Sequence, residues 1–148
     1  MIDGIEVRTA ASGDIDAIHR VEVNAFSAPW RREFFDAELQ LPGRVTLVAV
    51  DRSGEVAGYV FAMFIFEEMH VNKIAVSALF RRRGIARSLM ERCLEFARNS
   101  GIHVIALEVR KSNESAQAFY RTLEFTETYI RPRYYPDGEA AVIMSLVV

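Results

Sequence analysis

The stretch that most constrains this chain's fold lies at residues 70–92. There a short apolar run, Ile74-Ala75-Val76, leads into a basic segment, Arg81–Arg87, that contains a glycine. Beyond it, apolar residues recur at the three- and four-residue spacing of an amphipathic helix. The residues on this apolar face are Ile85, Ala86, Leu89, Met90, Cys93, Leu94 and Ala97. The pattern predicts a buried strand, a basic turn and a helix.

Such a strand, turn and helix form a candidate site for a phosphate group. A helix that starts near Arg82 or Arg83 leaves its first backbone N–H groups without partners, at the positive end of the helix dipole. Gly84 and Ala86 would let a ligand approach these groups, and the arginines add bidentate phosphate donors. The alternative is a helix that merely begins with a solvated basic run. The segment ends in neither the Gly-Lys-Ser/Thr of a P-loop nor a dinucleotide fingerprint.

Length and charge restrict the class of protein. A chain of 148 residues can form one domain, residues 1–148, with its own core, and neither a metal site nor a disulfide is expected. The net charge of −2 argues against a protein that coats nucleic acid, so the arginines are expected to bind a small polyanion. The single cysteine, Cys93, suggests a reducing compartment. Without a signal-peptide pattern or a long apolar run, we expect a cytoplasmic monomer or homodimer that does not bind membranes.

Hydrophobic periodicity predicts the remaining elements. Strands are expected at 5–9, 45–50, 56–66, 70–76, 102–109, 126–130 and 141–147, and helices at about 12–26, 31–40, 83–99 and 113–123. This β-α-α-β-β-β-α-β-α-β-β order indicates a mixed α/β (α+β) fold, in which the helix at 83–99 makes the strands on either side of it parallel neighbours. The nearly continuous apolar run at 102–109 predicts a strand buried on both faces.

Two side chains are candidates for acid and base chemistry. Glu108 follows an apolar run, Val104–Leu107. A buried carboxylate there is expected to have a raised pKa, which suits a general base. The alternative is a glutamate at the end of the strand that reaches water or pairs with Arg110. Tyr120 lies on the apolar face of the next helix, where a tyrosine is more often a core residue with its hydroxyl bonded to a carbonyl.

The basic turn resembles that of the GNAT superfamily of acetyl-CoA-dependent N-acetyltransferases. Arg81, Gly84 and Ala86 match its Arg/Gln-x-x-Gly-x-Gly/Ala motif, which follows a strand. The order of elements also matches the GNAT fold, with helices on both faces of a mixed sheet. The resemblance implies that acetyl-CoA is the cosubstrate and that the turn holds its pyrophosphate. It further implies contacts to acetyl-CoA from Ile74, Ala75, Val76, Arg81, Arg82, Arg83, Gly84, Ile85, Ala86 and Arg87.

Two further stretches, Leu107–Asn113 and Ala116–Tyr120, closely resemble the RimI-type family within this superfamily. That family acetylates the N-terminal alanine of a small-subunit ribosomal protein. The resemblance implies that Glu108 is the base and that Asn113 contacts CoA. It also implies that Tyr120 is the acid that protonates the departing thiolate.

The substrate side is suggested by two segments. Ala28-Pro29-Trp30 and Ile130–Pro136 resemble the segments that flank the peptide groove in this family, which implies substrate contacts for Trp30, Tyr134 and Tyr135. Glu68 could receive a cationic N-terminus. The alternatives are that the tyrosines pack within their own turn and that Glu68 is a solvated strand end.

The leading hypothesis is an enzyme that acetylates the N-terminal amine of a protein, such as a ribosomal protein, by direct attack on acetyl-CoA. Two alternatives are a GNAT enzyme that acts on a small-molecule amine and a non-catalytic acetyl-CoA sensor or partner subunit. Two positions depart from the family pattern. Glu124 stands where the family usually has a glycine before Phe125. The stretch Glu139-Ala140-Ala141 lacks the aspartate that the family pattern leads us to expect near Ala140.

Overall fold

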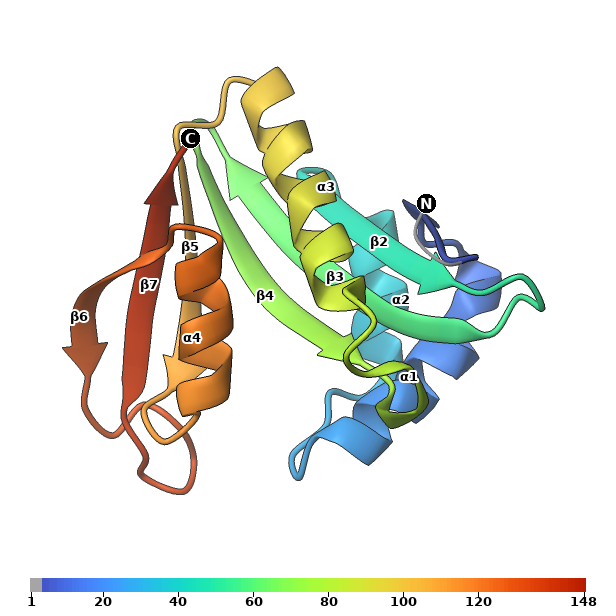
Figure 1. The fold of residues 1–148 in the computed structure, drawn as a ribbon, viewed down its shortest axis with the longest axis horizontal. Coiled ribbons are helices and arrows are strands. Elements are labelled where there is room, and N and C mark those ends of the chain that lie inside the picture. Colours follow the sequence, from blue (N-terminus) through green and yellow to red (C-terminus); the bar gives the residue numbers. More distant parts are fainter. Residues whose placement is uncertain (1–3) are drawn as a thin grey trace.

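Seven strands form one mixed sheet, in the order β1-β2-β3-β4-β5-β7-β6, in a computed structural model that describes residues 4–148 (Figure 1). The strands are β1 (Glu6–Thr9), β2 (Arg44–Val50), β3 (Val56–Ile65), β4 (Glu68–Val76), β5 (Val104–Arg110), β6 (Thr126–Arg131) and β7 (Ala141–Val147). The helices are α1 (Ile15–Ala25), α2 (Arg32–Gln40), α3 (Ile85–Asn99) and α4 (Glu114–Thr122), with short 3₁₀ turns η1 (Ser12–Asp14) and η2 (Ala78–Phe80).

The strand pairing confirms the predicted fold class. β4 and β5 are parallel, and every other neighbouring pair is antiparallel. The parallel pair is the one that the intervening helix α3 predicts, because parallel strands need a crossover connection. Apart from the two 3₁₀ turns, the order of elements is the predicted one.

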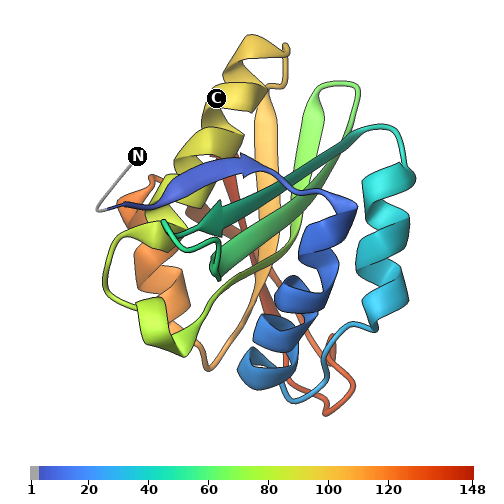
Figure 2. The same cartoon turned by 90° about the vertical axis from the view of Figure 1, so that its right-hand side faces the viewer.

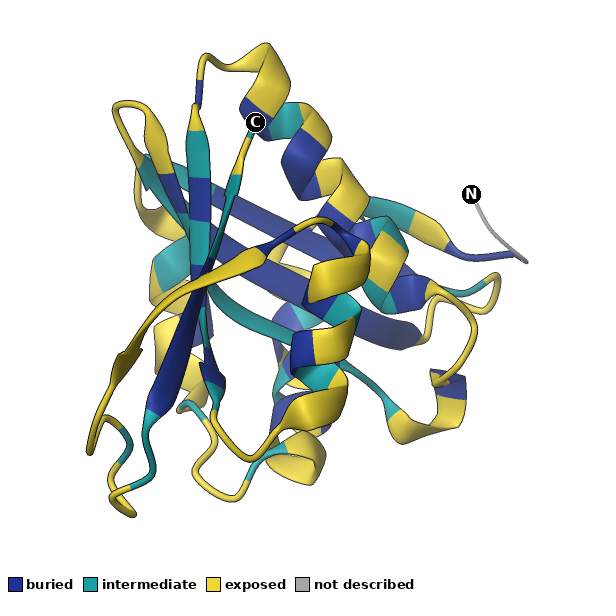
Figure 3. Cartoon of the chain, turned by 60° about the vertical axis from the view of Figure 1, so that its left-hand side comes forward, coloured by how far each residue is buried: buried dark blue, intermediate teal, exposed yellow. Residues whose placement is uncertain are grey.

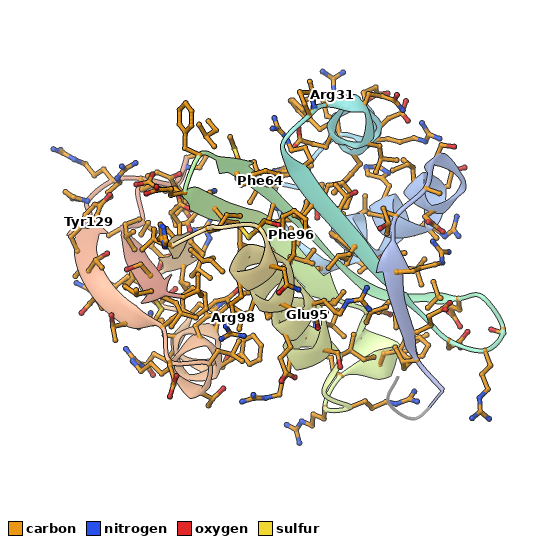
Figure 4. All side chains as sticks on the ribbon, turned by 90° about the horizontal axis from the view of Figure 1, so that it is seen from above. Arg31, Phe64, Glu95, Phe96, Arg98 and Tyr129 are labelled. Atoms are coloured by element: carbon orange, nitrogen blue, oxygen red, sulfur yellow. The ribbon has the colours of Figure 1, made fainter. Side chains whose placement is uncertain are left out.

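Helices cover both faces of the sheet (Figure 2). Seen from above, Arg31 at the start of α2 lies on one side of the sheet and Glu95 and Arg98 of α3 lie on the other (Figure 4). The core beneath α1 and α2 is aromatic: the Phe35 ring centroid lies 5.7 Å from that of Tyr59 and 5.1 Å from that of Phe61. The core beneath α3 is larger and mostly aliphatic. No helix within residues 4–148 is long and apolar enough to cross a membrane.

The prediction that the strand at 102–109 is buried on both faces was wrong. Burial alternates along β5, with Ile105, Leu107 and Val109 buried and the residues between them half-buried. The reason is the placement of the helices, because α1 and α2 pack against β2, β3 and β4 but do not extend over β5. β6 is exposed along its whole length (Figure 3).

The start of α3 also differs from the prediction. The helix begins at Ile85, two or three residues later than expected, because Arg82 and Gly84 have left-handed φ angles of 63° and 75°. Gly58 in β3 allows this arrangement. A Cβ there would lie 2.8 Å from the Ala75 carbonyl oxygen and 3.3 Å from a methyl group of Ile85, so only glycine lets the three segments approach this closely.

Glu124, at the position where the family resemblance leads us to expect glycine, has a left-handed φ of 73°. A non-glycine residue in this region costs about 1 kcal/mol or more. Replacing Glu124 with glycine should therefore raise the free energy of unfolding by up to about 1 kcal/mol, measured by urea denaturation. The matched control is Glu95→Gly, on the exposed side of α3, which should lower it by about 1 kcal/mol. Equal destabilisation by both variants would contradict this account of the turn.

Candidate active site

β4 and β5 run side by side only at their starts. Their pairing covers Glu68–His70 against Val104–Ala106, and beyond it the two strands diverge (Figure 1). β3 continues to pair with β4 as far as Val76. Among the described residues, the edge of β4 that faces β5 therefore has no strand partner over residues 71–76.

The alternation of the backbone identifies which groups lie on this open edge. The Ser77 N–H donates to the Ala57 carbonyl oxygen at 2.8 Å, and Ala75 is paired with Tyr59 in the same register. Since alternate residues turn their N–H and C=O groups to the same side of a strand, those of Ala75 point to β3. The groups of Ile74 and Val76 point toward the diverging β5. Of these three strand residues, all predicted to contact acetyl-CoA, Ile74 and Val76 present their backbone groups on the open edge.

The basic turn ends at an uncapped helix N-terminus. Gly84 is the N-cap of α3 and, within residues 4–148, it provides no side-chain cap and no acidic residue lies in the first turn. The Ser88 N–H already bonds to the Gly84 carbonyl oxygen at 3.0 Å. The N–H groups of Ile85, Ala86 and Arg87 precede it, so they have no acceptor within the helix. Together with the helix dipole, they favour an anion at this point.

The predicted arginines lie around this turn in different directions. Arg81 lines a hollow of about 430 Å³ between α1 and the segment after β4. Arg87 donates to the Thr122 hydroxyl at 3.1 Å and lines a second hollow, of about 470 Å³, between α3 and residues 122–124. Arg82 is exposed, and the Arg83 guanidinium lies 5.3 Å from the Phe80 ring centroid.

Asn113 is the N-cap of α4. Its side-chain oxygen accepts from the Ala116 N–H at 3.1 Å and from the Ser115 hydroxyl at 3.2 Å. The predicted contact between Asn113 and CoA would therefore come from its amide N–H groups.

Glu108 projects from the face of β5 opposite to its buried neighbours Leu107 and Val109. Its carboxylate accepts a hydrogen bond from a ring nitrogen of His70 and another, at 3.1 Å, from the Tyr134 hydroxyl. The other ring nitrogen of His70 meets the side-chain oxygen of Asn72. Glu108 thus joins β4, β5 and the hairpin between β6 and β7.

A β-bulge in β4 orients this cluster. Phe61 pairs with Lys73 and Ala62 pairs with Val71, so Asn72 is an extra residue in the strand. A bulge turns two successive side chains to the same face. The two successive side chains here are Asn72 and Lys73. Both therefore lie on the face of β4 that is turned toward α1, which is also the face of His70.

The partners of Glu108 reverse the predicted direction of its pKa. Burial alone would raise it, but the hydrogen bond and charge of His70, with smaller effects of Tyr134 and Arg131, leave the pKa of Glu108 below its usual value. The pKa of His70 is raised, mainly by its hydrogen bond to Glu108. Both ring nitrogens of His70 face oxygen acceptors, an arrangement that only the protonated ring can fully satisfy. The prediction of a raised pKa for Glu108 was wrong.

Arg110 is not the partner of Glu108. Its guanidinium lies 2.9 Å from both the Asp137 and the Glu139 carboxylates, which fastens the hairpin between β6 and β7 to the end of β5. Sequence reasoning also missed His70 and Asn72. The available signal was that both are polar and lie two positions apart in a predicted strand, so that they share a face.

Tyr120 lies in the core on the other side of β5, among Phe119, Phe125 and the buried side of the strand. Burial, with a smaller effect of the charge of Tyr135, raises the pKa of Tyr120 to about 12. The residue therefore keeps its proton at neutral pH. Burial and then the charge of Glu108 also raise the pKa of Tyr135, so this residue lies within electrostatic reach of both Glu108 and Tyr120.

Of the remaining predicted substrate residues, Tyr134 contacts Glu108 directly. The Tyr134 and Tyr135 rings meet edge to face with centroids 5.1 Å apart, and the Arg110 guanidinium lies 4.1 Å from the centroid of the Tyr135 ring. Trp30 lies between α1 and α2, 5.3 Å from Phe35 between ring centroids. Glu68 is exposed and leaves β4 on the same face as His70, two residues away.

Comparison with known proteins places these features in a family. The profile of the acetyltransferase (GNAT) family matches residues 15–125. A [ribosomal protein bS18]-alanine N-acetyltransferase of Escherichia coli is 33% identical over 141 residues, which cover 91% of this chain and 92% of the relative. An N-alpha-acetyltransferase of Sulfolobus acidocaldarius is 31% identical over 95% of this chain and 90% of the relative. The crystal structure of the ribosomal-protein-S18-alanine N-acetyltransferase from Escherichia coli superposes with a TM-score of 0.90 at 30% identity, covering 97% of this chain and 94% of that one.

The pairing of His70 with Glu108 predicts a pH dependence of stability. The contribution of His70 is complete below its usual pKa of 6.5 and is lost as the pH rises through its higher folded value. The contribution of Glu108 is complete above 4.5 and is lost as the pH falls through its lower folded value. The difference in Tm between the wild type and His70→Gln should therefore be largest between about pH 4.5 and 6.5 and should shrink above this range.

The same pairing can be followed by NMR. In Glu108→Gln the pKa of the His70 ring should fall relative to the wild type, because its negative partner has gone. An unchanged His70 titration in Glu108→Gln would show that the two side chains do not interact in solution.

Proposed function

The chain belongs to the acetyltransferase (GNAT) family, and on that premise we propose that it acetylates the N-terminal α-amine of a protein, such as the alanine N-terminus of a small-subunit ribosomal protein. The proposal is carried by the distribution of groups about β5. Glu108, His70 and Tyr134 lie on one face of the strand, and Tyr120 lies on the other. The Escherichia coli relative, named for the bS18 alanine, supports the choice of substrate.

Acetyl-CoA is the proposed acetyl donor, and it supplies the thioester that the amine attacks. The residues of this chain fit it in two places. The uncapped N-terminus of α3, with Arg82 and Arg83 before it, offers backbone N–H groups and positive charge to the pyrophosphate. The open edge of β4 offers the N–H and C=O groups of Ile74 and Val76 to the amide groups of the pantetheine arm.

The amine is proposed to approach Glu108 from the face of α1 and α2. An ionised carboxylate attracts the ammonium form, which must transfer a proton to Glu108 before the neutral amine can attack. An α-amine has a pKa of about 7.7 to 8.0 against about 10.4 for lysine, so its deprotonation costs roughly 3.5 kcal/mol less. A carboxylate with a lowered pKa is a weak base, and it therefore suits an N-terminal amine better than a lysine side chain.

Attack on the thioester gives a tetrahedral oxyanion, which a backbone N–H on the open edge of β4 can stabilise. As the C–S bond breaks, Tyr120 gives its proton to the sulfur. The acetyl group passes directly to the amine. Cys93 takes no part, because its burial on the core-facing side of α3 raises the pKa of its thiol to about 12 and keeps it protonated.

The test is an assay of CoA release with acetyl-CoA and short peptides that differ only at residue 1: Ala, Ser, Met and an N-blocked Ala control. Turnover is expected with free Ala or Ser N-termini and not with the blocked peptide. Activity on the blocked peptide only when it contains lysine would move the assignment to side-chain acetylation. Silence with every peptide, but turnover of polyamines, would indicate a small-molecule acetyltransferase.

Glu108→Gln and Tyr120→Phe should each lower kcat by about 10²- to 10⁴-fold, because each removes one proton-transfer group. Matched controls are Glu127→Gln and Tyr129→Phe on the exposed strand β6, which should leave kcat unchanged. Circular dichroism would verify that all four variants fold. Full activity of both site variants would refute the assigned acid and base.

A further inference from the structure

A fully buried carboxylate lies at the root of the segment that carries Trp30. Glu22 of α1 has none of its surface exposed. It accepts hydrogen bonds from the Tyr59 hydroxyl and, at 2.9 Å, from the backbone N–H of Trp30, and the Lys73 ammonium lies 3.0 Å away. One side chain of α1 therefore ties together β3, β4 and the segment between α1 and α2.

The cation of this cluster is nearly buried as well. The Lys73 side chain is 14% exposed. Its ammonium lies 3.9 Å from the ring centroid of Phe26 and 5.2 Å from that of Trp30, both in the segment between α1 and α2. A charge this deeply placed is costly unless it is paired, and here a carboxylate and two aromatic faces compensate it. The ion pair and the aromatic segment therefore depend on one another.

The cluster is continuous with the proposed active site. Lys73 follows Asn72, the extra residue of the β4 bulge, and Asn72 contacts the His70 ring that holds Glu108. A shift of Lys73 would be passed through the bulge to this histidine. The position of the segment that carries Trp30 and the position of the Glu108 carboxylate thus both depend on Lys73 and the bulge of β4.

We propose that Glu22 and Lys73 are positioning residues for the acceptor substrate, which set where residues 26–31 lie relative to Glu108. This inference rests on the proposed function, because it assumes that the acceptor binds on the face of α1 and α2. It assigns the pair no contact with acetyl-CoA, whose proposed site is the open edge of β4 and the N-terminus of α3. Loss of the pair should therefore affect the acceptor and spare the donor.

The chain provides its own probe, since Trp30 is its only tryptophan. In Glu22→Gln the Lys73 ammonium loses its counter-charge and the Trp30 N–H loses its charged acceptor. Trp30 fluorescence should shift to longer wavelength and be quenched more strongly by acrylamide. The KM for an Ala-initiated peptide should rise about tenfold, since a displacement near 1 Å in a positioned site costs up to about a hundredfold. The KM for acetyl-CoA should not change.

Two further variants keep the test decisive. If Glu22→Gln does not fold, Tyr59→Phe can replace it. This variant removes a single hydrogen bond to Glu22 and should give smaller changes in the same direction. Lys73→Arg keeps the charge and should retain most of the peptide affinity, whereas Lys73→Met should not. The matched control is Asp14→Asn, which breaks the 2.8 Å ion pair with Arg8 at the other end of α1. It should lower Tm without altering Trp30 quenching or the peptide KM.

The possible outcomes separate this inference from the proposed function. An active wild type with unchanged peptide KM in Glu22→Gln and Tyr59→Phe would overturn the positioning role alone. Equal rises in the KM values of peptide and acetyl-CoA would also overturn it, because they would indicate general loosening of the fold. A wild type that turns over no peptide would overturn the proposed function and the acceptor role with it.

Discussion

The divergence of β4 from β5 is the constraint on which the rest of this structure depends. β4 keeps β3 on one edge but loses β5 after His70, so several of its backbone groups have no strand partner within residues 4–148. Unpaired backbone groups are costly when they are buried, and they persist where water or a ligand can satisfy them. The same strand pair is parallel, which requires the crossover through α3. The open edge and the uncapped helix N-terminus therefore follow one another along one connection, which runs from β4 through the basic turn into α3.

The bulge at Asn72 has a second, local effect. Without an extra residue, strict alternation would turn Lys73 to the face of α3 and place a charge in the aliphatic core. With it, the side chains of His70, Asn72 and Lys73 all project from the face of the sheet that α1 and α2 cover. Ile74 and Val76 project into the larger core on the other face. The polar residues of β4 are therefore gathered on the face that we assign to the acceptor.

The sequence predicts the parts of this structure that depend on local pattern. The row from Ile85 to Ala97 predicts α3, and α3 in turn predicts the parallel strands. The basic turn is recognisable from its spacing, although the left-handed angle of Arg82 is not, because nothing about an arginine signals it. Burial of β5 was misjudged, since an apolar run does not reveal which helices will cover it.

Contacts between distant residues are beyond such reasoning. His70 is separated from Glu108 by 38 positions, and Glu22 from Tyr59 by 37. Neither spacing has a periodic signature, so neither partner could be assigned from sequence. The error in the direction of the Glu108 pKa has this origin. Burial was inferred correctly, but the sign is decided by a cation from another strand.

That cation connects substrate binding to protonation. Two positive charges placed beside the Glu108 carboxylate would repel each other, so Glu108 can pair strongly with only one cation at a time. A protonated His70 already neutralises the carboxylate, and an arriving ammonium would compete with it. Binding of the ammonium should therefore lower the pKa of His70, and, because linkage is reciprocal, deprotonation of His70 should strengthen binding. With a neutral His70 ring beside it, the charge of the Glu108 carboxylate is no longer compensated. The carboxylate then attracts the ammonium more strongly and has a somewhat higher proton affinity. The pairing that makes Glu108 a weak base when the site is empty is thus relieved by the substrate itself.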